Sequence, residues 1–153
     1  MRNPEEIIFE INNFSELKEY KLNHKIELAN RHSFNKHLRL CKPIHKRLFF
    51  KGASKKDWKS WLNEGTEYYL LFIDDKPVAR CAIERYSDAA WEAADVKTAL
   101  NYRNKGLSKE VVSFVTRKIL EQGRTATCST MPDNYAMLKV IESLGYKRKY
   151  DYD

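Results

Sequence analysis

The sequence contains no long apolar run. Its longest, from Tyr68 to Ile73, has only the length of a strand, whereas a helix that spans a bilayer needs about 20 apolar residues. The N-terminal residues Met-Arg-Asn-Pro-Glu-Glu also lack the apolar core of a signal peptide. We therefore expect a cytoplasmic protein that does not associate with membranes.

Cysteine is too sparse for a disulfide framework. The three cysteines are odd in number and scattered along the chain, unlike the even, regularly spaced sets of small secreted domains. Cys81 and Cys128 fall within predicted strands, and we expect both to be small core residues.

No metal site is expected either. His37, Cys41 and His45 recur at steps of four, a spacing that aligns side chains on one helix face. Pro43 interrupts that helix, however, and the pattern has no fourth ligand.

Two glycine-rich phosphate loops, GxxxxGK[ST] and GxGxxG, are absent. The net charge of +7 nevertheless favours acidic partners: a phosphorylated cofactor, an anionic substrate or nucleic acid. The Lys and Arg residues are spread along the chain, and no RNP, KH or zinc-finger pattern is present. Nucleic acid is therefore the weaker interpretation of the charge.

The length of 153 residues suits one domain with a single sizeable core. No repeat, low-complexity tract or interdomain linker interrupts the sequence. We predict that residues 1–153 form one domain.

The most informative stretch is a strand, a short basic loop and a helix. A strand-like run from Ala94 to Ala99 leads into the loop. From Leu107 an amphipathic pattern predicts a helix packed on a sheet. Its apolar stripe comprises Leu107, Val111, Val115 and Ile119, widened by Val112 and Leu120.

The loop itself has the features of a phosphate-binding turn. Gly106 permits positive φ and a close approach of another group to the backbone. Arg103 and Lys105 add charge where the free N–H groups and the positive end of the helix dipole gather. Such a place binds a phosphate or pyrophosphate. The alternative is an ordinary turn with a solvated basic rim.

A second helix is predicted near the C-terminus. Asn134 lies near the start of its apolar pattern, which stops at Gly145 and Tyr146. Between the two helices, the β-branched run from Thr125 to Thr130 predicts a buried strand.

In this order, the segments resemble the GNAT-type N-acetyltransferases. Residues 103–108, Arg-Asn-Lys-Gly-Leu-Ser, are similar to the family's R/Q-x-x-G-x-G/A loop and follow its usual strand and Y-R pair. Asn134 matches the Asn that opens the family's last helix, with a Gly-aromatic pair eleven and twelve residues later. The resemblance extends from about Tyr68 to Tyr150.

The resemblance implies a mixed α/β fold. A mostly antiparallel central sheet, flanked by helices, would splay between two parallel strands, here Ala90–Thr98 and Thr125–Thr130. Alternation and turn residues predict further strands at Lys25–Ala29, Thr66–Ile73 and Val78–Tyr86, with a turn at Asp74–Pro77.

Lys25–Ala29 resembles the family's first strand, so residues 1–24 would be an N-terminal extension with a strand near Ile7–Ile11 and a short helix from Ser15. Two helices are expected between the first two strands. They are one that begins at Ser33 or Asn35 and ends near Pro43, and one from the capping box Ser54–Asp57 through Trp58 and Trp61 to Gly65.

The resemblance also implies acetyl-CoA as cosubstrate. Its pantetheine arm would pair with backbone groups near Val96 and Thr98, as if adding a strand. Its pyrophosphate would contact the loop residues Arg103, Asn104, Lys105, Gly106, Leu107 and Ser108. Asn134 would bond the pantetheine or orient its thiol end, and Met137 is a contact or a core residue.

Transfer of acetyl to an amine requires a base, a donor for the oxyanion and, in some cases, an acid for the leaving thiolate. Glu92 matches a general-base glutamate of the histone-modifying branch, and Glu84 on the neighbouring strand is the other candidate. Both are also ordinary strand carboxylates. A backbone N–H near Val96 would stabilise the oxyanion. If Glu84, Glu92 and Asp95 line the cleft, a cationic small amine or a lysine or N-terminal amine is the expected acceptor.

The sequence departs from the family at Leu100, where a Pro often precedes the Y-R pair, and at Ser108, which replaces the small Gly/Ala of the loop. Two further departures bear on the chemistry. Ile141 replaces the Tyr that protonates the leaving thiolate in many members, so Tyr135, Tyr150, Tyr152 or water would have to substitute. The tail after Tyr146 is too short for the usual closing hairpin, which would leave the acceptor side open or completed by a second subunit of a homodimer.

We therefore predict an acetyl-CoA-dependent N-acetyltransferase that transfers acetyl directly to a primary amine. A CoA-binding protein without transferase activity is the first alternative, because of Ile141. A basic nucleic-acid-binding module is the second.

Overall fold

The computed structural model describes residues 5–29, 56, 60 and 67–150 of the chain. Within these residues the strands are β1 (Ile7–Ile11), β2 (Lys25–Ala29), β3 (Glu67–Ile73), β4 (Lys76–Glu84), β5 (Ala90–Thr98), β6 (Thr125–Thr130) and β7 (Lys147–Arg148). The longer helices are α4 (Leu107–Glu121) and α5 (Tyr135–Ser143), and short 3₁₀ turns lie at Phe14–Glu16 (η1) and Leu100–Tyr102 (η2).

Several predictions fall outside the described residues. They are the helices expected between 33 and 65 with Trp58 and Trp61, the candidate metal ligands His37, Cys41 and His45, and Tyr152.

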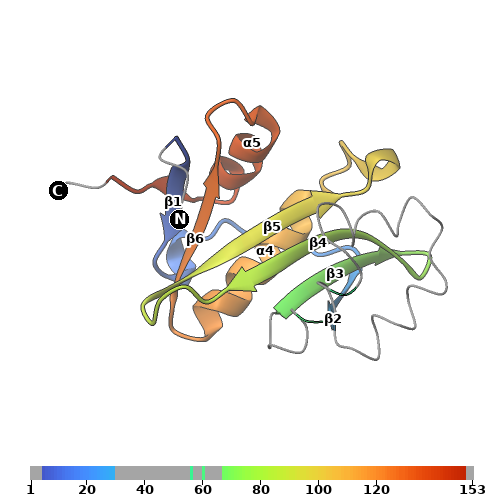
Figure 1. Ribbon diagram of the computed structural model, residues 1–153, viewed down its shortest axis with the longest axis horizontal. Helices are drawn as coiled ribbons and strands as arrows, with labels where there is room; N and C mark the ends of the chain where they lie inside the picture. Colours follow the sequence, from blue (N-terminus) through green and yellow to red (C-terminus); the bar gives the residue numbers. More distant parts are fainter. Residues whose placement is uncertain (1–4, 30–55, 57–59, 61–66, 151–153) are drawn as a thin grey trace.

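The described strands form one sheet in the order β2-β3-β4-β5-β6-β1-β7. Neighbouring strands run antiparallel, except for the parallel pair β5 and β6 near the centre. Figure 1 shows α4 lying across one face of this sheet and α5 beside the end of β6. The predicted mixed α/β sheet with one parallel pair is confirmed.

The β3–β4 hairpin has a tighter turn than expected. Asp74 and Asp75 both have positive φ, 50° and 61°, a conformation that Asp tolerates and that gives a two-residue hairpin turn. Ile73 already pairs with Lys76. The predicted four-residue turn ending at Pro77 is therefore two residues too long.

The core lies between α4 and the sheet. Val111, Val115 and Ile119 are fully buried, as the apolar stripe predicted, and burying each such side chain contributes about 1.5–3 kcal/mol. They pack in one cluster with side chains from β1, β3, β4, β5 and β6.

Cys81 and Cys128 belong to this core, which confirms the prediction for both. Each is fully buried, and burial raises the pKa of the Cys128 thiol to about 12. Both thiols therefore remain protonated and unreactive in the folded protein at neutral pH.

The N-terminal segment is part of the sheet. β1 pairs with β6 along all five of its residues, and its other edge pairs with β7. This part of the predicted N-terminal extension therefore belongs to the same sheet as the rest of the chain. The local pattern of Ile7–Ile11 predicted the strand, but its partner lies more than 110 residues away in sequence, from Ile7 to Thr130.

Gly145 allows the N-terminal segment to pack against the end of α5. It has φ +100°, and a Cβ at this position would overlap the main-chain oxygen of Glu16. The Lys18 N–H donates to the Leu144 carbonyl at 2.9 Å in the same place. The segment therefore approaches α5 as closely as glycine permits.

We expect Gly145→Ala to destabilise the fold by about 3 kcal/mol or more, because backbone strain at positive φ adds to a steric overlap that requires main-chain movement. Chemical denaturation measures the loss.

Gly123→Ala is the matched control for this substitution. Gly123 also has positive φ, +73°, but a Cβ there would meet nothing within 4 Å. Its cost should therefore be only the strain of about 1–2 kcal/mol. Equal losses in the two variants would contradict the close packing of the N-terminal segment on Gly145.

Candidate functional site

The two parallel strands separate into a fork. β5 and β6 pair only at their first residues, Ala90–Glu92 with Thr125–Thr127, although β5 continues to Thr98 and β6 to Thr130. Figure 1 shows the two strands diverging from this point. The edge of β5 beyond Glu92 therefore has no partner strand among the described residues, and an extended ligand can pair with it.

A β-bulge lies in this part of β5, in its pairing with β4. Arg80 pairs with Lys97 and Ala82 pairs with Ala94, so two residues of β5 lie opposite one residue of β4. One of the two, Asp95, has φ +52°. Such an insertion bends the strand and shifts the alternation of its main-chain groups by one residue.

The bulge determines which peptide groups face the fork. The Ala99 N–H donates to the Val78 carbonyl of the β4 side at 2.8 Å. Because direction alternates along a strand, the main-chain groups of Val96 and Thr98 point the other way, into the fork. These are the two residues predicted to pair with a pantetheine arm. The Arg103 Nε donates to the Thr98 carbonyl at 3.1 Å.

The loop after β5 has the predicted turn geometry. Asn104 and Gly106 have positive φ, 64° and 77°, and Gly106 is the N-cap of α4. Within residues 5–29 and 67–150, the main-chain N–H groups of residues 104 to 109 form no hydrogen bond. Exposed N–H groups at a helix N-terminus favour an anion.

The predicted loop side chains divide between solvent and the fold. Arg103, Asn104 and Lys105 are exposed. Leu107 is buried in the core, so it offers only main-chain atoms to a ligand. The Ser108 hydroxyl lies 2.6 Å from that of Thr98, and this bond ties the helix to β5.

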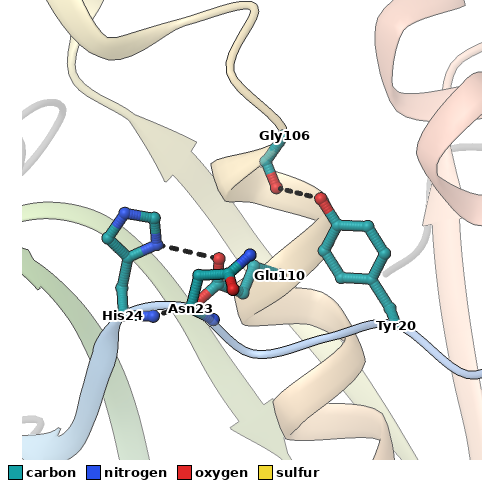
Figure 2. Close-up of polar contacts among 5 residues, drawn as sticks. All are labelled: Tyr20, Asn23, His24, Gly106 and Glu110. Carbon is teal, nitrogen blue, oxygen red and sulfur yellow. Dashed lines mark hydrogen bonds and ion pairs between the residues drawn. The ribbon is translucent and has the colours of Figure 1, made fainter.

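The N-terminal segment around Tyr20 contacts the loop and the first turn of α4, a contact that no sequence pattern indicated. The Tyr20 hydroxyl donates to the Gly106 carbonyl at 3.4 Å, and the Lys109 ammonium lies 4.6 Å from the Tyr20 ring centre. Figure 2 shows this ring beside the first turn of α4.

The same segment is anchored on a buried carboxylate. Glu110 is 2% exposed and accepts hydrogen bonds from the main-chain N–H groups of Asn23 and His24 at 3.0 and 2.8 Å. The His24 ring nitrogen Nδ1 lies 2.9 Å from its other oxygen, as Figure 2 shows. A Glu inside the apolar stripe, directly before Val111, was the only sequence signal for this anchor.

α5 begins on the β6 side of the fork. Asn134 is its N-cap, and its side-chain oxygen accepts from the Met137 N–H at 3.2 Å. The predicted helix start is therefore confirmed, and the side-chain amide N–H groups of Asn134 are left for other partners. Met137 is half-buried and packs against the core.

Glu92 lies where the fork closes. Its carboxylate is on the face opposite α4, because the adjacent Ala93 belongs to the core under that helix. The Ser129 hydroxyl donates to one oxygen at 2.9 Å and the Thr127 hydroxyl to the other at 3.4 Å. The Tyr86 hydroxyl lies 3.0 Å from that of Thr127. Glu92 is only 7% exposed.

The other two acidic residues differ from Glu92 in their surroundings. Glu84 lies directly opposite Glu92 across β4 and β5 and is exposed. Asp95 is ion-paired with Arg80, a residue 2% exposed, at 3.0 Å. Tyr68 also donates to Asp95, at 3.5 Å. Arg80 therefore offsets the charge of Asp95, which weakens the expected acidic lining.

Burial, and then the neighbouring Asp95 carboxylate, raise the pKa of Tyr68 to about 12. The phenol is therefore protonated at neutral pH and remains a hydrogen-bond donor.

Neither a metal site nor a membrane span appears in the part of the chain that the structure describes. No group of three His, Cys, Asp or Glu side chains there could hold a metal ion. No helix among these residues is long and apolar enough to cross a bilayer.

Comparisons with known proteins match both part of the sequence and the fold. The model of the FR47-like protein family matches residues 84–152, which include β5, the loop, α4, β6 and α5. No curated protein matches the sequence.

Solved structures match over most of the chain. A GNAT-family acetyltransferase of Colwellia psychrerythraea has TM-score 0.72 and 17% identity, over 94% of this chain and 52% of its own. A protein of Novosphingobium aromaticivorans assigned to the GNAT acetyltransferases has TM-score 0.70 and 16% identity, over 94% and 59%. A GNAT acetyltransferase of Elizabethkingia anophelis with acetyl-CoA bound has TM-score 0.62 and 16% identity, over 85% and 80%.

The chain has the GNAT fold. The resemblance drawn from the loop and the second helix is confirmed at this level. The chain spans 52% and 59% of the length of the Colwellia and Novosphingobium proteins.

Ile141 was predicted to take the place of a tyrosine that many relatives have seven residues after the Asn. Ile141 is fully buried in the core. Tyr135, at the start of α5, is 76% exposed, and Tyr150 is 58% exposed.

The closing hairpin expected of the GNAT fold is replaced here. β7 is only two residues long, but β1 occupies the place beside β6. The chain's own N-terminal strand therefore covers this edge of β6, and an open acceptor side or a second subunit stays a prediction.

Proposed function

We propose that the chain is an acetyl-CoA-dependent N-acetyltransferase that transfers acetyl directly to a primary amine. The observation that carries the proposal is the fork. The β5 edge, unpaired among the described residues and with two peptide groups turned outward, ends at a helix N-terminus whose N–H groups bond to none of those residues. That arrangement suits a ligand with an extended amide arm and a pyrophosphate. The Elizabethkingia structure, which has the same fold, contains acetyl-CoA.

In this proposal the pantetheine amides pair with the main-chain groups of Val96 and Thr98. The pyrophosphate binds the N–H groups of residues 104–108, since the Arg103 N–H donates to the Leu100 carbonyl, and the charges of Arg103 and Lys105 lie beside it. Pairing of the arm with Thr98 would release the Arg103 guanidinium from the Thr98 carbonyl for the phosphates. Asn134 would offer its side-chain amide from the opposite side of the fork.

The chemistry is an addition followed by an elimination. The amine nitrogen attacks the thioester carbonyl carbon, the proton lost by the amine passes to Glu92, and the carbon–sulfur bond breaks to release CoA thiolate. The Val96 N–H stabilises the oxyanion of the tetrahedral intermediate. Water protonates the thiolate, because Ile141 cannot. Holding both substrates in the fork supplies much of the rate.

For the acceptor, we propose a cationic amine: a small molecule, a lysine side chain or an N-terminal amine. The support is the pair of carboxylates Glu84 and Glu92 on the same face of β4 and β5. Asp95 is not part of this acidic pair, because the ion pair with Arg80 offsets its charge.

One observation favours a second candidate, a CoA-binding protein that transfers nothing. The buried Ile141 leaves the thiolate without a protein acid at that position.

Calorimetric titration with acetyl-CoA, followed by a thiol-release assay on a panel of amines, tests the proposal. We expect a Kd between about 1 μM and 1 mM, the range in which enzyme KM values usually lie, and acetyl transfer to at least one cationic amine. Binding without transfer to any amine would favour the second candidate. If acetyl-CoA does not bind while oligonucleotides bind with strong salt dependence, the chain is instead a nucleic-acid-binding module.

A further inference from the structure

Asp95 is held in a conformation that an L-residue rarely adopts. Its φ is +52° in the middle of a strand, and such strain persists only when the surroundings enforce it. Arg80 Nη2 binds its Oδ1 at 3.0 Å, Arg80 Nε donates to its main-chain oxygen at 3.3 Å, and the Tyr68 hydroxyl donates to Oδ2 at 3.5 Å. Hydrogen bonds therefore hold both the side chain and the main chain of Asp95 in place.

The bulge that these contacts hold determines which peptide groups of β5 face the fork. Before the bulge, the Ala89 carbonyl accepts from the Thr125 N–H at 3.0 Å, so odd-numbered residues face β6. In a regular strand this alternation would turn residues 95 and 97 toward the fork. Because the bulge inserts one residue, Val96 and Thr98 face it instead.

Stability alone is a weak reason for this arrangement. A buried arginine with an ion pair often contributes no more stability than an apolar residue of similar size. Arg80 is 2% exposed and lies on β4, where its neighbours Ala79, Cys81 and Ala82 are buried and small or apolar. A role in fixing the backbone geometry of β5 explains better why position 80 has a charged residue.

We propose that Arg80 and Asp95 are positioning residues that hold the β5 bulge, so that the main-chain groups of Val96 and Thr98 meet the extended amide arm of the cofactor. The inference rests on the proposed function, because it presumes CoA in the fork. Neither residue touches the reacting atoms. Their effect passes through the backbone of β5.

Two ligands separate the arm from the phosphates. CoA reaches both the loop and the β5 edge, whereas adenosine 3′-phosphate 5′-diphosphate keeps the pyrophosphate and lacks the arm. The ratio of their dissociation constants, fragment over CoA, measures what the arm contributes. Calorimetry on the parent and on each folded variant gives this ratio without an acceptor.

In Arg80→Met and Asp95→Ala, we expect the ratio to fall by about tenfold while the fragment binds as in the parent, since the loss of one or two hydrogen bonds of about 1 kcal/mol each corresponds to that factor. Asp95→Asn keeps an acceptor oxygen and tolerates positive φ, so its ratio should stay within about threefold of the parent. The conservative variant thus rescues the effect.

Asp95→Gly keeps the test decisive if the first two variants fail to fold. Glycine adopts φ +52° freely but lacks the carboxylate that Arg80 and Tyr68 grip, so its ratio should fall as well. Arg85→Met is the matched control. Arg85 follows β4, pairs with Glu67 and lies over Trp91, and its loss should leave the ratio unchanged.

An unchanged ratio in folded Asp95→Gly would overturn the inference, as would a parent that binds CoA no better than the fragment. A parent that binds neither ligand would instead remove the proposed function itself.

Discussion

Replacing Gly106 by Trp should weaken acetyl-CoA binding at least about 100-fold, which is about 2.7 kcal/mol. The indole would cover the N–H groups of residues 104–109, which form no hydrogen bond within the described part of the chain. Gly106 also has φ +77°, which an L-residue adopts only with strain, and its Cβ would lie 2.6 Å from the Tyr20 hydroxyl oxygen. Titration calorimetry with acetyl-CoA measures the loss.

The same helix offers the control. Gly123 lies just beyond the other end of α4 with a similar φ of +73°, and open space surrounds its Cβ position. Gly123→Trp therefore imposes a comparable backbone strain far from the loop and should bind acetyl-CoA like the parent. If both variants lose binding, general damage explains the result. If Gly106→Trp binds normally, the loop is only a turn.

A smaller side chain refines the test. At Gly106, Ala would first meet the hydroxyl of Tyr20, the far end of a side chain that can rotate away. Gly106→Ala should accordingly weaken binding much less than Gly106→Trp, because the phosphate surface stays open. The graded response would assign the large effect to the volume of the indole and not to the loss of glycine alone.

The sequence predicted those elements whose signals are local. β5 and β6 have the bounds that β-branched and alternating residues indicated, Ala90–Thr98 and Thr125–Thr130. α4 begins at Leu107 and α5 after its N-cap Asn134. In each case, residues within one turn or one strand determine the outcome, so a single sequence was sufficient.

What the sequence could not give depends on strand register. The hydrophobic pattern of Ile7–Ile11 is the same whether the strand is an extension or lies between β6 and β7. Only the pairing of Ile7 with Thr130 shows where the strand lies in the sheet. A bulge likewise depends on the pairing of two strands, and no sequence pattern around Asp95 predicts it. The one available hint was a charged Arg80 among small and apolar residues.

The features of the candidate site also divide into those with local sequence signals and those that depend on distant residues. The loop and the helix start at Asn134 were visible as motifs, because glycine and capping residues have fixed backbone roles. The outward direction of Val96 and Thr98 agrees with the prediction, but its cause, the bulge, was not foreseen. The supports at Tyr20 and His24 are separated from the loop by more than 80 residues, and no spacing rule links them.

Glu92→Gln should lower the rate of acetyl transfer by about 10²–10⁴-fold, the usual contribution of a general base, while acetyl-CoA binds as in the parent. The amide keeps the size of the carboxylate and can still accept from Ser129 or Thr127. It cannot take the proton of the amine. The measurement is thiol release at saturating acetyl-CoA, with whichever amine the parent acetylates fastest.

Glu84→Gln supplies the comparison that gives this result meaning. The two residues are register partners on one face of the sheet, so each substitution removes the same charge from the same face. They differ in environment: Glu92 is buried at the point where the fork closes, and Glu84 is exposed. If attraction of a cationic acceptor is what matters, both variants should raise KM by similar factors. If proton removal matters, only Glu92→Gln should lower kcat. A Glu92→Gln enzyme with full kcat would mean that this carboxylate merely fastens β5 to β6 through Ser129 and Thr127, and that the amine loses its proton to water.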